Sequence, residues 1–318
     1  MIEAVNLTKR YGKKTAVDNI SFTVEPGTVT GFLGPNGAGK STTMRMIMGL
    51  DKPTSGKVTI NGRPYRQLSA PLCEVGALLD AKGLHGSRSA RSHLRQLAAS
   101  NGIPAKRVDE VLDITGLTSV AKKRVKGFSL GMGQRLGIAA ALLGDPGVLL
   151  FDEPVNGLDP EGVKWVRETC RRLAGEGRTV FISSHLMSEM AQTADHLLVI
   201  GRGRILTAGP VNDVIASATT DRVRVASPQA TQLAELMASR NLAAQPVAPN
   251  VLETTATTAA TIGELAAQGG IVLHELTTIR ASLEEAYMTL TSDSVEYRTD
   301  PASQAQMQQA VPQAPARG

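Results

Sequence analysis

One stretch of the sequence limits the possible folds more than any other. Residues 34–41 are Gly-Pro-Asn-Gly-Ala-Gly-Lys-Ser, which satisfies the pattern G-x-x-x-x-G-K-[S/T]. The apolar run Val29–Leu33 precedes it, as a strand would, and Met44 and Met48 follow it at helical spacing. Glycines let backbone N–H groups converge on phosphate oxygens, and the N-terminus of a following helix adds partial positive charge. The pattern therefore predicts a strand, a phosphate-binding loop and a helix, in that order.

We expect this phosphate loop to hold the phosphates of ATP together with Mg²⁺. The Lys40 ammonium should reach the β- and γ-phosphates, and the Ser41 hydroxyl should bind the metal ion. The predicted nucleotide contacts in this segment are Gly34, Pro35, Asn36, Gly37, Ala38, Gly39, Lys40, Ser41 and Thr42. An accidental glycine turn is the alternative, and the flanking strand and helix argue against it.

A second apolar segment, Leu149–Phe151, ends in the acids Asp152 and Glu153. On its own this pattern also fits the start of an ordinary loop. Combined with the phosphate loop, it predicts that Asp152 binds Mg²⁺, directly or through water, and that Glu153 polarises the attacking water. Phosphoryl transfer depends on positioned charges more than on covalent chemistry. Together, Lys40, Ser41, Asp152 and Glu153 would supply those positioned groups.

The hydrophobic pattern indicates an α/β core. Short apolar runs at 148–151 and 180–182 are typical of parallel strands buried on both faces. Strand patterns dominate as far as about residue 70, and residues 88–143 have helical spacing. We therefore expect a nucleotide-binding domain over 1–215, with a helical subdomain inserted at about 81–143.

After residue 215 the composition becomes rich in Ala and Thr. The predicted order is a strand at 222–226, a helix at 229–239, strands at 243–247 and 251–255, a helix at 262–267 and a strand at 271–276. This β-α-β-β-α-β order suggests a small ferredoxin-like α+β domain over 216–291, closed by a helix at 282–290. Residues 292–318 are rich in Gln, Ala and Pro, cannot build a core and are expected to be disordered.

Composition narrows the cellular setting. The longest uninterrupted aliphatic run is 138–143, far short of the ~20 apolar residues of a membrane span, and the N-terminus has no signal-peptide pattern. We expect a cytoplasmic or cytoplasm-facing protein. Cys73 and Cys170 have no Cys-x-x-Cys or Cys/His spacing, which argues against zinc and against a disulfide framework. We predict that both are small buried hydrophobic side chains.

A basic stretch runs from Lys82 to Lys126, with ten Lys or Arg residues against three acids. The net charge of the whole chain is only +5 at pH 7. Because no aromatic residues are interleaved for base stacking, we interpret the stretch as a solvated helical face and expect no nucleic-acid partner.

The segment Phe128-Ser129-Leu130-Gly131-Met132-Gly133-Gln134-Arg135 resembles the signature motif of ABC ATPases, in the Ser-Leu-Gly-Met form of many drug and peptide exporters. The resemblance implies that Ser129 and Gly131, at a helix N-terminus, hold the γ-phosphate of a nucleotide bound to the opposite subunit. A plain helix entry with Ser129 as N-cap is the alternative.

Other pieces follow in the order of that family. Tyr11 lies where the family stacks an aromatic ring on adenine; the alternative is a surface tyrosine on a strand. The segment Asn156–Pro160, which contains Asp159, resembles the loop that signals between two ATP sites; the alternative is a plain turn. His185 resembles the switch histidine that contacts the γ-phosphate; the alternative is a capping histidine.

One position departs from the family pattern. The family usually has Gln at the end of the strand that leads into the helical insertion, whereas this sequence has Asp80, and exporter-type relatives also carry an acid there. An ionised carboxylate accepts but cannot donate hydrogen bonds, so Asp80 can bind Mg²⁺ but cannot donate to water or phosphate. We include Asp80 among the predicted nucleotide and metal contacts, as a coupling residue.

The resemblance covers residues 2 to about 215 and extends weakly to about 290, and it is strongest to the ATP-binding subunits of daunorubicin- and bacitracin-resistance exporters. It implies an α/β fold of the P-loop ABC ATPase type, with an antiparallel β subdomain, the inserted helical subdomain and a small α+β C-terminal domain.

The same resemblance implies a function. We expect an ATP-hydrolysing homodimer, peripheral on the cytoplasmic face of the membrane, that drives separate membrane-spanning permease subunits and exports a drug, an antibiotic or a peptide. A non-transport ABC ATPase acting on ribosomes or DNA is the alternative, but no fused second cassette or long coiled coil supports it. A regulatory module without turnover is a further alternative, and the intact acid pair argues against it.

Overall fold

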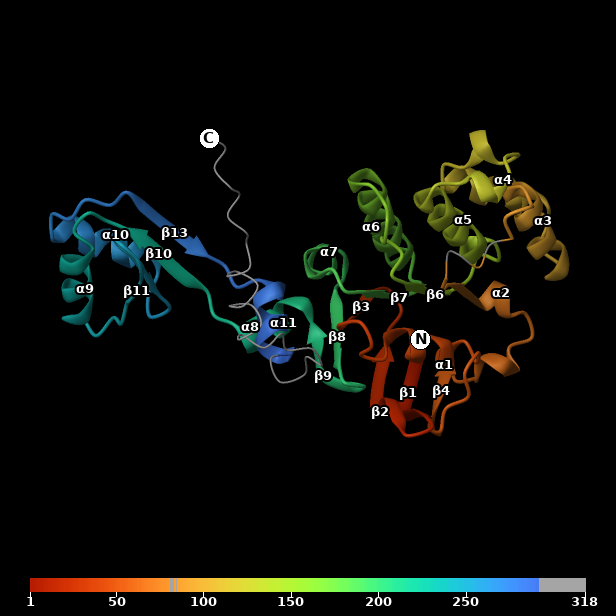
Figure 1. Ribbon diagram of the computed structural model, residues 1–318, viewed down its shortest axis with the longest axis horizontal. Coiled ribbons are helices and arrows are strands. Elements are labelled where there is room, and N and C mark those ends of the chain that lie inside the picture. Colours follow the sequence, from red (N-terminus) through yellow and green to blue (C-terminus); the bar gives the residue numbers. More distant parts are fainter. Residues whose placement is uncertain (81–82, 84, 292–318) are drawn as a thin grey trace, which may run out of the picture.

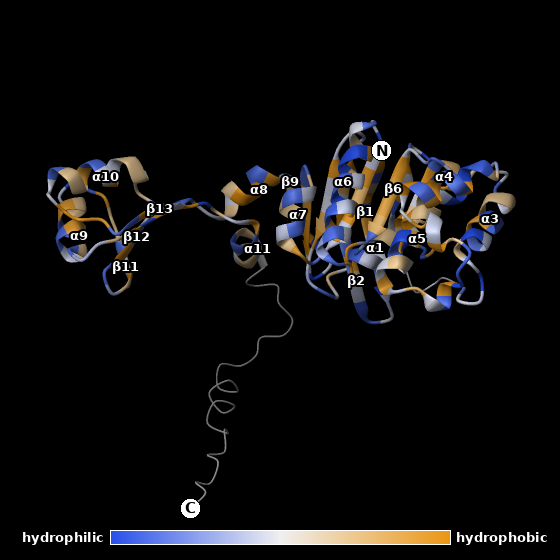
Figure 2. Cartoon of the chain, turned by 90° about the horizontal axis from the view of Figure 1, so that it is seen from above, coloured by the Kyte–Doolittle hydropathy of each residue, from blue (hydrophilic) through white to orange (hydrophobic). Residues whose placement is uncertain are grey.

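The computed structural model describes residues 1–80, 83 and 85–291. Two sheets and their helices form one large body, and a small third sheet with its own helices extends from one side of it (Figure 1). Figure 2 shows the hydrophobic strands of the large body lying inside, among helices. The tail predicted to be disordered, 292–318, lies outside the described residues.

The central sheet carries the phosphate loop. Its order is β5-β6-β7-β3-β8-β9; the first five strands are parallel and the last is antiparallel to its neighbour. The strands are β3 (Val29–Leu33), β5 (Val75–Leu78), β6 (Val148–Asp152), β7 (Thr179–Ser184), β8 (His196–Gly201) and β9 (Arg204–Pro210). All residues of β3 and β7 are buried, as expected for inner parallel strands covered on both faces. The predicted α/β core is confirmed.

A second, antiparallel sheet has the order β2-β1-β4. Its strands are β1 (Ile2–Tyr11), β2 (Lys14–Val24) and β4 (Ser55–Ile60). Helix α1 (Lys40–Ile47) buries Met44 and Ile47 in a core shared by both sheets. In the same core, the rings of Phe22, Phe32 and Phe181 have centroids 5.3 to 6.1 Å apart. This aromatic cluster fixes the two sheets against each other, and with them the base of the phosphate loop.

Helices cover the rest of the large body. They are α3 (Ala90–Ser100), α4 (Lys106–Ile114), α5 (Leu130–Leu142), α6 (Pro160–Gly175) and α7 (Met187–Thr193), with short helical turns at Tyr65–Gln67, Pro71–Glu74 (α2), Thr118–Val120 and Val125–Gly127. Side-chain caps set where three of them begin: Ser89 caps α3, Ser129 caps α5 and Asp159 caps α6. The three helices α3, α4 and α5 form the inserted helical subdomain and bury their apolar faces in one core.

The remaining elements belong to the C-terminal region. They are α8 (Val211–Ala218), β10 (Arg222–Ala226), α9 (Ala230–Ala238), β11 (Gln245–Ala248), β12 (Val251–Thr254), α10 (Ala259–Gln268), β13 (Glu275–Ile279) and α11 (Leu283–Thr291). The sheet order is β11-β12-β10-β13, and all neighbours are antiparallel. Helix α11 returns to the large body, where Leu283 and Tyr287 are buried in the core that contains Met190 of α7. The domain boundaries themselves stay a prediction.

The strand predicted at 271–276 is wrong in position, because the structure has β13 at Glu275–Ile279. Ile271 belongs to the end of α10: its N–H donates to the Ala266 carbonyl at 2.9 Å, after Gly270 with φ of +64°. This geometry closes a helix C-terminus with a buried apolar residue just beyond the glycine. An apolar residue after a glycine pair therefore marked a helix stop and not a strand.

Candidate active site

The phosphate loop joins β3 to α1 with a backbone that requires glycine. Gly37 and Gly39 have φ of +82° and +112°. A Cβ at Gly34 would lie 2.5 Å from the carbonyl oxygen of Ile200, and one at Gly39 would lie 2.7 Å from that of Ala16. Helix α1 begins without a side-chain cap, so its first N–H groups are left for an anion. The loop therefore fits the phosphates of a nucleotide.

The Lys40 side chain lies inside this loop and is only 5% exposed. Its Nζ donates to the carbonyl oxygens of Gly34 at 2.7 Å and Pro35 at 3.3 Å. The same Nζ lies 3.3 Å from Oε1 of Glu153. The lysine charge is thus held where phosphates are expected, and a carboxylate balances it.

Glu153, directly after β6, lies between Lys40 and His185. Its Oε2 lies 2.7 Å from Nδ1 of His185, and its backbone has φ of +51°. The N–H of Glu153 donates to Oγ of Ser183 at 3.0 Å, and that hydroxyl donates to Oδ1 of Asp152 at 2.5 Å. Ser183, at the end of the neighbouring strand β7, therefore positions both acids. No motif in the sequence marks this serine.

A cavity of about 250 Å³ opens above the phosphate loop. Its lining residues are Ala16, Pro35, Asn36, Gly37, Gly39, Lys40, Ser41, Thr42, Glu153, Asn156 and His185. The cavity therefore brings seven of the nine predicted loop residues together with two predicted residues from the ends of β6 and β7, while Gly34 and Ala38 do not line it. Ala16 and Asn156 were not predicted as contacts; Ala16 lies on β2, far from any motif, and approaches the loop through its backbone.

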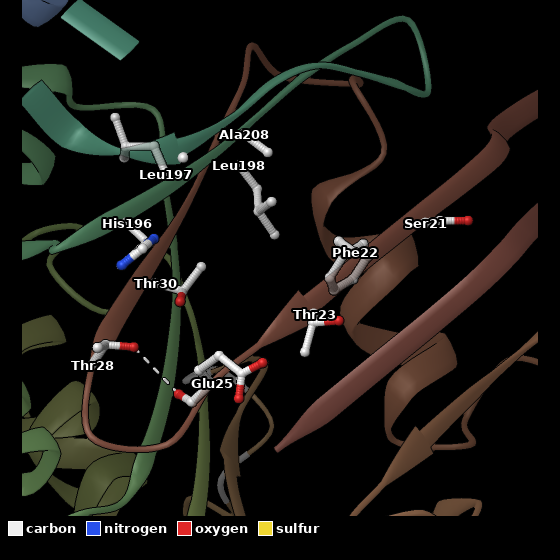
Figure 3. Close-up of a pocket in the computed structure, with 11 residues that line it drawn as sticks. Ser21, Phe22, Thr23, Glu25, Thr28, Thr30, His196, Leu197, Leu198 and Ala208 are labelled. Carbon is white, nitrogen blue, oxygen red and sulfur yellow. Dashed lines mark hydrogen bonds between the residues drawn. The ribbon is translucent and has the colours of Figure 1, made fainter. Parts of the chain in front are cut away.

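A second cavity, of about 270 Å³, lies between β2, β3, β8 and β9 (Figure 3). Thr28 and Thr30 line it near the start of β3, and Thr28 Oγ1 donates to the Glu25 carbonyl oxygen at 3.3 Å. The phosphate loop follows the opposite end of that strand. None of the predicted site residues lines this second cavity, so it is not the predicted nucleotide site.

The ligands predicted for Mg²⁺ are the Ser41 hydroxyl and the carboxylates of Asp152 and Asp80. All three are hard oxygen donors of the kind this ion prefers. Within residues 1–80, 83 and 85–291, no group of three or more His, Cys, Asp or Glu side chains is arranged to hold a metal. A magnesium ion here would therefore take its other ligands from nucleotide phosphates and water, as this ion commonly does.

The predicted signature residues lie outside the cavity of their own chain. Ser129 is exposed and its Oγ accepts from the Met132 N–H at 3.2 Å, so it caps α5 as the alternative interpretation had it, while its O–H remains a donor. A Cβ at Gly131 would lie 3.2 Å from Cδ2 of Leu158, so this motif packs against the following loop. Asp159 caps α6 by accepting from the Gly162 N–H at 2.9 Å.

Tyr11 and Asp80 also lie outside the cavity lining. The Tyr11 ring is 48% exposed, its hydroxyl donates to Asp51 at 2.9 Å, and Lys9 Nζ lies 4.8 Å from the ring centroid. Asp80 is exposed and follows β5, in which Leu78 pairs with Phe151 of β6. The register therefore places Asp80 beside the end of the strand that carries the acid pair.

Comparison with known proteins decides the family. A family model described as ABC transporter matches residues 17–156, and one described as a domain of unknown function (DUF8746) matches residues 221–284. The bacitracin transport ATP-binding protein BcrA of Bacillus licheniformis is 46% identical over 66% of this chain and 70% of its own length. The chain belongs to the ABC transporter ATP-binding family.

Other ABC relatives match nearly the whole chain. The uncharacterised ABC transporter ATP-binding protein YhcH of Bacillus subtilis (strain 168) is 35% identical over 93% of this chain and 97% of its own length. The daunorubicin resistance ATP-binding protein DrrA3 of Streptomyces coeruleorubidus is 32% identical over 90% of this chain and 94% of its own length. Alignments of this length include the C-terminal region as well as the ATPase core.

A solved structure described as a dimeric bacterial ABC transporter cassette is 25% identical, with a TM-score of 0.62 over 66% of this chain and 99% of its own. The predicted family and ABC ATPase fold are confirmed, and with them an ATP-binding and ATP-hydrolysing cassette. Among the helices that the structure describes, none is both long enough and apolar enough to cross a membrane.

Proposed function

We propose that this ABC protein is the ATP-hydrolysing subunit of an exporter and drives separate membrane-spanning permease subunits. The observation that carries the proposal is the position of Glu153 between Lys40 and His185. BcrA and DrrA3 are named for bacitracin transport and daunorubicin resistance, which supports a drug, an antibiotic or a peptide as the cargo. The chain would then work on the cytoplasmic face of the membrane, held there by its partners.

At the site, the phosphates of ATP enter the loop and displace the Glu153 carboxylate from Lys40. Glu153 is then free to orient the attacking water and to accept its proton. His185 keeps Nδ1 toward Glu153 and directs its other ring nitrogen to the γ-phosphate. Ser41 and Asp152 would hold Mg²⁺, which neutralises charge on the phosphate oxygens.

A second copy of the chain completes each site. The exposed Ser129 and the half-buried Gly131 of one copy would meet the γ-phosphate held by the other, in a two-fold arrangement. Asp159, in the loop that packs on Gly131, would signal between the two nucleotides. ATP then favours the closed dimer, and hydrolysis favours the open one, which is a population shift driven by the γ-phosphate.

Two further roles complete the proposal. The exposed Tyr11 ring stacks on adenine, and its bond to Asp51 orients it. Asp80, beside the end of β6, would couple the nucleotide site to the helical subdomain, and its carboxylate would supply an oxygen ligand to Mg²⁺. If Asp80→Ala left both the ATPase rate and transport unchanged, this coupling role would be wrong.

Membrane association tests the transport function against an action on ribosomes or DNA. A tagged chain, expressed with its own neighbouring genes, should co-purify from detergent-solubilised membranes with an apolar, multi-span protein. Glu153→Gln should stop export of the substrate while this co-purification remains. Recovery of the chain with ribosomes, and not with a multi-span protein, would overturn the proposal.

A further inference from the structure

We propose that a basic loop next to the signature helix binds anionic phospholipid headgroups, which gives the chain an affinity of its own for the membrane surface. The basic loop consists of Arg88, Lys122, Lys123, Arg124 and Lys126, and all five side chains are exposed. The inference uses the placement at the membrane that the proposed function requires.

The charges of the basic loop are not balanced inside the chain. None of its five cations forms an ion pair with a residue that the structure describes. Arg88 instead contacts the neutral amide of Gln96. Elsewhere in the same subdomain cations do find acids, as Arg91 does with Asp109 at 2.7 Å. Clustered like charges repel, so an external anion stabilises them.

The backbone holds these cations in place. The Val125 N–H donates to the carbonyl oxygen of Arg88 at 2.9 Å, and the Lys126 N–H donates to that of Gly86 at 2.9 Å. A further bridge joins Ser89 to Arg124. The basic side chains therefore project from a fixed two-segment frame and not from a loose tail, so binding a flat anionic surface costs little conformational freedom.

The surroundings of the basic loop favour a lipid surface over nucleic acid. Residues 81–127 contain no Phe, Tyr or Trp, so bases would have nothing to stack on. Clusters of four to eight Lys or Arg next to a membrane attract anionic headgroups, and each cation near the surface strengthens binding by about fivefold. The basic loop leads directly into Ser129, so a membrane that holds it also fixes the approach of the signature helix.

Vesicle co-sedimentation tests the inference with the full chain. We expect binding to vesicles of phosphatidylglycerol and phosphatidylcholine, little binding to pure phosphatidylcholine, and loss of binding as salt is raised. Changing Lys122, Lys123, Arg124 and Lys126 together to Gln should weaken binding by more than about a hundredfold. The control changes four exposed cations elsewhere to Gln: Lys57, Lys164, Arg171 and Arg240. This control variant has the same net charge as the basic-loop variant. It should bind anionic vesicles nearly as well as the unaltered chain does.

Three results would overturn the inference. They are equal binding to both kinds of vesicle, equal losses in the two variants, and no binding to anionic vesicles at all. The last result, together with loss of permease co-purification in the basic-loop variant, would assign the loop to an acidic protein segment. The vesicle assay needs neither ATP nor a permease, so its failure would leave the proposed function intact. If the quadruple variant misfolds, the single Lys→Gln variants still test the inference. Each should weaken binding to anionic vesicles by about fivefold.

Discussion

Lys40 and Glu153 form an ion pair at the bottom of the nucleotide cavity, with 3.3 Å between Nζ and Oε1. The pair sets the Glu153 carboxylate against the ammonium of a lysine that is only 5% exposed. In the proposed mechanism, Glu153 becomes available to the attacking water only when a nucleotide phosphate takes over the lysine. This one contact would then link nucleotide binding to activation of the site.

The first prediction concerns Lys40. Lys40→Ala should weaken ATP binding by tenfold or more, since hydrogen bonds to charged groups contribute roughly 1.5–3 kcal/mol. Titration of the purified chain with a fluorescent ATP analogue measures this. Lys164→Ala, on the exposed face of α6, is the matched control and should bind as the unaltered chain does. An unchanged dissociation constant for Lys40→Ala would contradict the assigned role.

The second prediction compares two glycines with similar φ. Gly157 and Gly62 have φ of +73° and +79°, so alanine at either should cost about 1–2 kcal/mol of folding free energy. A Cβ at Gly157 would also lie 2.0 Å from Cδ2 of Leu130, whereas one at Gly62 meets nothing within 4 Å. Leu130 is exposed and can swing away, but it adjoins Ser129. We therefore expect similar melting temperatures, and a loss of ATPase activity of about tenfold or more for Gly157→Ala alone.

The third prediction concerns helix α11. Leu283 is 2% exposed in the core that contains Met190 of α7, whereas Met288 on the same helix is 67% exposed. Leu283→Ala should cost about 2–5 kcal/mol, and Met288→Ala should change stability by less than about 0.5 kcal/mol. Urea denaturation followed by far-UV circular dichroism compares them. Equal midpoints would show that α11 does not pack on the ATPase core in solution.

The fourth prediction concerns alkaline pH. Burial raises the pKa of the Cys170 thiol from 9.0 to about 12. The unfolded chain loses this proton first, so the thiol favours unfolding as pH rises from about 9 to 12, by about 1.4 kcal/mol per pH unit, and has no effect at pH 7. The unaltered chain should therefore lose stability faster than Cys170→Ala over that range. Parallel curves of unfolding free energy against pH would contradict this.

The motifs predicted the residues that line the cavity better than the residues that position them. The phosphate loop, Glu153 and His185 do line one cavity, because parallel strands end at a common edge and the apolar runs marked those strands. Ser183 could not be predicted, because a serine at a strand end belongs to no recognisable sequence pattern. Its contacts with Asp152 and Glu153 depend on the pairing between β6 and β7.

The residues proposed to act between two copies could not be placed at a nucleotide from one chain. Ser129 and Asp159 both cap helices here, which is what local sequence alone predicts for Ser and for Asp before Pro. Their proposed contact with a nucleotide depends on a second copy. Likewise, the apolar pattern placed Ile271 in a strand. In the structure it is buried at the end of α10, a position that depends on the glycine pair before it.

ATP-dependent association of Glu153→Gln tests the central claim most directly. The amide cannot accept the proton of water, so hydrolysis should fall by at least about a hundredfold while ATP still binds and closes the dimer. Sedimentation velocity should give the mass of one chain without nucleotide and twice that mass with Mg²⁺ and ATP. Adding Ser129→Arg to this variant should keep it at the mass of one chain. One mass under all conditions, or substantial residual hydrolysis, would contradict the account.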